Sequence, residues 1–231
     1  SASAPRSARP NPSAAANDRR RMTRQWVGVG GLAAALIGWK FVTSRIPARW
    51  HPLPHVLFGT TVWGLSGASP LGLRPPALWS GLRWGASAAA PVVLAVAVGT
   101  AIPAVREGMA VQKLPTPVSH WLLVRIPVGT VWSEEVAYRA SLSILAARVF
   151  GIPAGRVFAA AAFGLSHVPD ARATGQPVIL TVLATGTAGW IFAWLFGRST
   201  SVAAPMLAHL AVNEAGAVAA LAVQRRRRAR A

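Results

Sequence analysis

The sequence predicts an all-α membrane protein, a polytopic bundle of six to eight transmembrane helices around a buried polar active-site cavity. Hydrophobic residues make up 53% of the 231 residues, and the mean hydropathy is +0.41. Charged residues make up only 13%, about half of the share in a soluble domain. Such a chain lacks the polar surface of a soluble globule. It suits a lipid environment, where a helix satisfies its own backbone hydrogen bonds.

Apolar stretches recur along the chain, and each is long enough, or nearly so, to cross a ~30 Å hydrocarbon core as a helix. They cover residues 26–46, 54–68, 84–105, 118–150, 153–168, 177–196 and 202–223. Between them, residues 71–82 contain two adjacent prolines and one arginine, and Arg83 follows directly. This composition favours an interfacial turn followed by a short amphipathic helix.

The charges lie mainly at the ends of the chain and between the apolar stretches. The chain has 24 Lys and Arg against 6 Asp and Glu, which gives a net charge of +18. Basic runs that flank apolar stretches are typical of membrane proteins whose ends contact anionic lipid headgroups, and this pattern argues against nucleic-acid binding. Both termini are arginine-rich, so we expect both to be cytoplasmic. An even number of spans then requires either that 54–68 is re-entrant or that 118–150 comprises two elements.

Three regions follow from this pattern. Residues 1–24 are rich in Ser, Ala, Pro, Asn and Arg, and we expect them to form a disordered basic tail. A signal peptide is not expected, because the basic region is too long and no small-residue cleavage site follows. Residues 25–223 form the transmembrane domain and residues 224–231 a basic C-terminal tail. We therefore expect an integral multi-pass protein of the cell membrane. The chain has no cysteine, which excludes disulfides and a cysteine nucleophile.

Half of the six acidic residues lie inside apolar stretches, where a charge costs roughly 2.5–3.5 kcal/mol to insert. These residues are Glu134, Glu135 and Glu214. Glu135 and Arg139 lie four residues apart, on one face of a helix, and can pair. Glu134 lies about 100° further around the helix and has no local partner. The cost of burying such a group indicates that Glu134 is kept for function.

Two later apolar stretches carry further polar side chains at helical spacing. Phe163 and His167 lie four residues apart, as do His209 and Asn213. A carboxylate can take a proton from water, histidines can bind a metal or hold the water, and an amide can donate to a developing oxyanion. The three stretches therefore offer the groups that hydrolysis requires. For each residue alone, the alternative is polar packing between membrane helices.

Three motifs thus follow one another on separate apolar stretches: Glu134-Glu135-x-x-x-Arg139, Phe163-x-x-x-His167 and His209-x-x-x-Asn213. Together they resemble the signature of the CPBP intramembrane protease family, which includes the type II CAAX prenyl endopeptidases and the bacterial Abi relatives. The motifs occur in the order of that family and cover roughly the C-terminal half of the chain.

The resemblance implies an intramembrane endopeptidase that acts on a membrane-associated peptide or protein. It implies that Glu134 is the base that activates water and that His167 holds the water, or a metal, with it. His209 and Asn213 would bind the other side of the water or stabilise the oxyanion. Whether the substrate is prenylated does not follow from these residues.

The same resemblance gives Glu135 and Arg139 a supporting role behind the catalytic residues. Two mechanisms stay open: a divalent metal such as zinc held by Glu134, His167 and His209, or a glutamate-activated water without a metal. The chain contains no His-Glu-x-x-His, so a zincin-type site is excluded.

Three other functions compete with this hypothesis. Gly64-Leu65-Ser66-Gly67 resembles the serine motif of rhomboid proteases, but here His-x-x-x-Asn follows the serine, whereas in rhomboids it precedes it. A non-catalytic scaffold or immunity-type protein would share the fold. A proton-coupled transporter would use buried acids and histidines as a relay, with Asp170 and Glu214 as candidates. Transporters often contain two related halves, and the sequence has no evident repeat.

Overall fold

The computed structural model describes residues 12–47, 50–67 and 70–230, and over these residues every regular element is a helix. The predicted all-α class is therefore confirmed. The elements are α1 (Pro12–Thr43), α2 (Pro52–Ser66), α3 (Ala77–Gly99), α4 (Pro103–Val111), α5 (Val118–His120), η1 (Trp121–Trp132), η2 (Glu135–Ser143), α6 (Ile144–Phe150), α7 (Ile152–Leu165), α8 (Val168–Thr174), α9 (Val178–Ser199) and α10 (Ala203–Arg228).

Four of the described helices are long and apolar enough to cross a membrane, which indicates an integral membrane protein. They are residues 19–43 of α1, and helices α3, α9 and α10. The expected count of six to eight spans is not confirmed. Helix α2 has 15 residues, about 22 Å of helix, which is short for a ~30 Å core. The stretch 84–105 is divided, because α3 ends at Gly99 and α4 begins at Pro103.

Residues 118–150 form one continuous helical path. Elements α5, η1, η2 and α6 follow one another without a loop, and η1 and η2 have the wider turns of a π-helix. Pro127 lies inside η1, where its missing N–H and its ring disturb the α-helical hydrogen-bond pattern. Glu134 lies between the two wide segments. Such π-helical segments are frequently found at functional sites.

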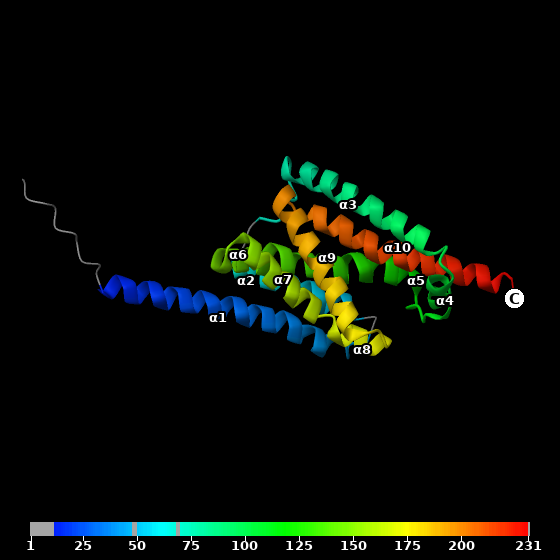
Figure 1. The fold of residues 1–231 in the computed structure, drawn as a ribbon, viewed down its shortest axis with the longest axis horizontal. Helices are drawn as coiled ribbons and strands as arrows, with labels where there is room; N and C mark the ends of the chain where they lie inside the picture. Colours follow the sequence, from blue (N-terminus) through cyan, green and yellow to red (C-terminus); the bar gives the residue numbers. More distant parts are fainter. Residues whose placement is uncertain (1–11, 48–49, 68–69, 231) are drawn as a thin grey trace, which may run out of the picture.

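Small residues let the long helices approach each other closely. Helix α3 runs along α10, and α7 packs against α9 (Figure 1). A Cβ atom on Gly85 of α3 would lie 2.8 Å from the Cβ of Leu207, and one on Gly164 of α7 would lie 2.6 Å from the carbonyl oxygen of Val182. Packing through small residues is typical of helices in membranes. It brings α7, α9 and α10 into one bundle. His167 follows directly after the end of α7, and His209 lies on α10.

The helices extend further toward both ends of the chain than the sequence indicated. Helix α1 begins at Pro12, inside the region expected to be a disordered tail, and residues 1–11 lie outside the described residues. Its first half extends beyond the rest of the bundle (Figure 1). At the other end, α10 continues through the basic segment as far as Arg228. Alanine and arginine are good helix formers, and basic residues suit the last turn of a helix.

The segment 71–82 also differs from the prediction. Helix α3 begins at Ala77, so the second part of this segment is the start of a long apolar helix and not a separate amphipathic one. Residues 71–76 form the turn that was expected before it.

Candidate active site

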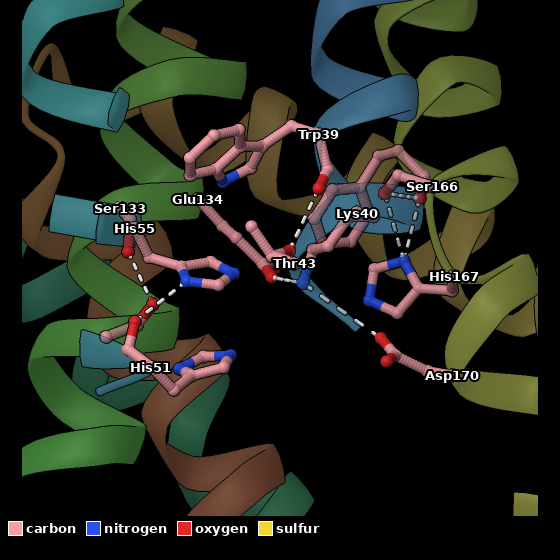
Figure 2. Close-up of polar contacts among 12 residues, drawn as sticks. Trp39, Lys40, Thr43, His51, His55, Ser133, Glu134, Ser166, His167 and Asp170 are labelled. Carbon is pink, nitrogen blue, oxygen red and sulfur yellow. Dashed lines mark hydrogen bonds and ion pairs between the residues drawn. The ribbon is translucent and has the colours of Figure 1, made fainter. Parts of the chain in front are cut away.

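Glu134 is held between two helices by a long-range ion pair. Its carboxylate is 4% exposed, and its Oε1 accepts a hydrogen bond from the Nζ of Lys40, on α1, at 2.5 Å. The Lys40 ammonium lies between Glu134 and Asp170, 4.0 Å from the Oδ2 of Asp170 (Figure 2). Glu134 therefore has an ion-pair partner, Lys40, on α1, although it has none on its own helix. The sequence did not predict this partner.

The second oxygen of Glu134, Oε2, is buried and has no hydrogen-bond partner among the described residues. One carboxylate oxygen is thus occupied by Lys40, and the other is left for a further donor. A buried acceptor without a partner is unusual and calls for an explanation such as a catalytic role or a bound water.

Glu135 and Arg139 form the ion pair that their spacing predicts. The Nε of Arg139 lies 2.9 Å from Oε2 of Glu135, and its Nη2 donates to Oε1 at 3.1 Å. Neither side chain is more than 1% exposed. The guanidinium also lies over the rings of Phe163 and Phe192, at 4.2 and 5.2 Å. Arg139 is therefore enclosed by the bundle.

His209 contacts both glutamates. Its Nδ1 lies 2.8 Å from Oε1 of Glu135, and because an ionised carboxylate only accepts, Nδ1 carries the hydrogen. In the neutral ring, Nε2 is then an acceptor, and it lies 3.9 Å from Oε2 of Glu134. The ring is stacked on Phe192, with centroids 5.1 Å apart. Two facing acceptors at this separation are too far apart for a direct hydrogen bond, and they suit a water that donates to both.

His167 lies between α7 and α8, with its ring fixed by the preceding turn. Its Nδ1 lies 2.8 Å from the carbonyl oxygen of Phe163, so Nδ1 is the donor and Nε2 is left for the site. Figure 2 shows the ring beside Lys40 and Asp170. The spacing Phe163-x-x-x-His167 therefore gives the histidine an anchored orientation.

Asn213 and two serines, Ser66 and Ser166, have less defined surroundings or packing roles. Asn213 is half-buried one turn after His209, and its side chain makes no hydrogen bond within the described part of the chain. Ser166 donates to the carbonyl of Phe163 at 2.8 Å, as a packing residue does. Ser66 donates to the carbonyl of Trp63 at 2.8 Å, at the end of α2. The Gly-x-Ser-Gly segment is therefore a helix end.

A small cavity lies beside Glu134. The volume of this cavity is about 20 Å³, enough for about one water molecule. It is enclosed by α1, α2 and the helix of Glu134, with Lys40 and His55 in its lining. The buried polar active-site cavity expected in the bundle is not confirmed, and the small space next to Glu134 lies on the side of α1 and α2.

Two polar residues at this site, Lys40 and His55, were missed by the sequence analysis, and a third, Asp170, was named there only as a candidate for a transporter relay. Lys40 is one of two lysines in the chain and lies in an apolar stretch, so the cost of burying a charge could have identified it. Asp170 lies in the first turn of α8. His55 is 3% exposed, donates a hydrogen bond from Nδ1 to the carbonyl oxygen of His51 at 2.8 Å, and has a buried Nε2 without a described partner.

The side chains suggested for a metal do not fit one as they are arranged. Within residues 12–47, 50–67 and 70–230, no group of three or more His, Cys, Asp or Glu side chains is positioned to hold a metal ion. The Lys40 ammonium already contacts Glu134. A zinc centre needs three protein ligands, and Glu134, His167 and His209 do not form such a set.

Fold and site together define a helical membrane protein with a buried cluster of glutamate and histidine side chains. Residues 116–215 match the family described as type II CAAX prenyl endopeptidase Rce1-like, which confirms the resemblance based on the three motifs. This match covers less than half of the chain, and all motif residues lie within it. No curated protein and no solved structure matches the chain.

Proposed function

We propose that the protein is an intramembrane endopeptidase that hydrolyses a peptide bond with a water activated by Glu134. One observation carries this proposal: Oε2 of Glu134 and Nε2 of His209 face each other at 3.9 Å, and the glutamate oxygen is buried without a partner. A water between them donates one hydrogen to each acceptor and keeps a lone pair for the substrate carbonyl. The family match supports membrane endopeptidase activity in general.

These contacts support the following reaction. Glu134 takes a proton from the water as the water oxygen bonds to the carbonyl carbon. His209, fixed by its hydrogen bond to Glu135, orients the water. The resulting oxyanion accepts a hydrogen bond from the Asn213 amide, and His167 lines the opposite side. The proton on Glu134 then passes to the leaving nitrogen as the carbon–nitrogen bond breaks.

The substrate of this reaction is a membrane-associated peptide or protein, and the protein acts in the cell membrane with its basic ends on anionic lipid. To test this, the protein purified in detergent is incubated with peptides that end in a CAAX sequence, prenylated and unprenylated. Cleavage that depends on Glu134 supports the proposal. If no peptide is cleaved in detergent or in anionic vesicles, the non-catalytic scaffold becomes the better hypothesis.

Activity is expected to withstand metal removal. The alternative is a divalent metal such as zinc at Glu134 and the histidines, but the ammonium of Lys40 lies 2.5 Å from the Glu134 carboxylate and repels a second cation. Peptide cleavage should be unchanged after dialysis against a chelator. A loss that one divalent metal restores, with a stoichiometric amount of that metal in the untreated protein, would support the metal mechanism instead.

His209→Ala is expected to lower kcat by at least ~100-fold, in the range for a lost acid–base group, with a small change in KM. The reason is that the water loses one of its two acceptors while substrate contacts elsewhere remain. The matched control is His120→Ala, which removes a histidine at the end of α5, outside the site. If both variants cleave at the parent rate, His209 does not hold the water.

A further inference from the structure

We propose that Lys40 is a positioning residue of this active site: its ammonium keeps Glu134 ionised and holds the carboxylate so that Oε2 faces His209. The inference rests on the proposed function, because it concerns the same base. Lys40 lies on α1, outside the residues that match the family. The site is therefore completed by a helix that the motifs do not include.

The first argument is charge compensation. A buried carboxylate without a cation is strongly disfavoured and takes up a proton. The nearby Arg139 is already paired with Glu135. Among the described residues, Lys40 is the cation in ion-pair contact with Glu134. A protonated Glu134 cannot take a proton from water, so the base depends on Lys40 for its ionised state.

The second argument is geometry. The ammonium of Lys40 contacts Oε1 of Glu134, and Oε2 is the oxygen that faces His209. A lysine is a compact charge that can donate to one oxygen, whereas an arginine fork tends to bind both oxygens of a carboxylate. The contact thus satisfies one oxygen and leaves the other for water.

The third argument is the anchoring of the ammonium itself. Lys40 is 12% exposed, and its Nζ has a second acid, Asp170, at 4.0 Å (Figure 2). Two acids on either side keep the ammonium between α8 and the helix of Glu134. Lys40 therefore connects three segments that are distant in the sequence and fixes Glu134 relative to them.

The absence of cysteine from the chain allows a direct test. Lys40→Cys introduces a single thiol, and alkylation with 2-bromoethylamine restores an ammonium at nearly the original length. Alkylation with bromoethane gives a neutral side chain as the matched control, and mass spectrometry verifies both modifications. We expect kcat of Lys40→Cys and of its ethylated form to fall by at least about tenfold. The aminoethylated form should recover most of the loss, with KM little changed.

A second measurement needs no substrate. Dicyclohexylcarbodiimide modifies protonated carboxyl groups in apolar surroundings and spares ionised ones. In the parent protein, Glu134 should resist modification. In Lys40→Cys it should be modified, and aminoethylation should restore the resistance. Modification of Glu134 in the parent protein would overturn the inference.

The two proposals fail in different ways. If Glu134→Gln cleaves peptides as fast as the parent, the proposed function is wrong, and the carbodiimide result still decides the state of Glu134. If Glu134→Gln is inactive while Lys40→Cys or its ethylated form is as active as the parent, the proposed function stands and the role of Lys40 is wrong.

Discussion

Glu134→Gln is expected to reduce peptide hydrolysis by at least ~100-fold, the loss typical of a removed general base. The substitution keeps the shape of the side chain but removes the charge and the proton acceptor that faces His209 across 3.9 Å. The loss should fall on kcat, measured with a fluorogenic peptide in detergent.

The matched control is Glu107→Gln, which changes a glutamate on α4 that is 71% exposed. This variant should keep the parent rate. Thermal unfolding of both variants verifies that they are folded. A folded Glu134→Gln protein with parent activity rules out Glu134 as the base.

Arg139→Ala is expected to lower the free energy of unfolding by about 3–5 kcal/mol, the cost of leaving one member of a buried ion pair without its partner. Glu135 is fully buried, and its two oxygens are bound by Arg139 and by His209. Removal of the guanidinium leaves this carboxylate without its counter-ion. Denaturant or thermal unfolding in detergent measures the loss, and activity should fall with it.

The control for this prediction is Arg227→Ala, which breaks a surface pair with Glu107 at 3.5 Å. Exposed pairs are worth about 0–1 kcal/mol, so this variant should be close to the parent in stability. The double variant Glu135→Gln with Arg139→Ala should be more stable than the sum of the single losses, because it leaves no unpaired charge. An Arg139→Ala protein that is stable but inactive would assign Arg139 to the substrate.

The features that the sequence predicts well are local or compositional. An apolar chain with few charges must form helices in a membrane, and this determines the all-α class. The pair of Glu135 and Arg139 is predictable because four residues correspond to about one turn of any helix. The anchoring of His167 by Phe163 follows the same spacing.

The features that the sequence does not predict depend on how the helices pack. Lys40 reaches Glu134 across 94 residues, and such a contact depends on which helices are neighbours and how they are rotated. The same rotation turns Nδ1 of His209 toward Glu135 and Nε2 toward Glu134, which no spacing within one helix predicts. The number of spans is not confirmed, for another reason. Hydropathy measures apolar length, and it does not detect that a helix ends at Gly99 and a new one begins at Pro103.

The central claim is that a water held by Glu134 attacks the substrate carbonyl, and a single turnover in ¹⁸O-labelled water tests it most directly. With enzyme in excess over peptide, each site reacts once, and mass spectrometry then measures the label in the new carboxylate of the product and in Glu134. The account predicts ¹⁸O in the product carboxylate and none in Glu134. Label in the Glu134 side chain, with unlabelled product, would mean that Glu134 attacks the carbonyl itself and would contradict the account.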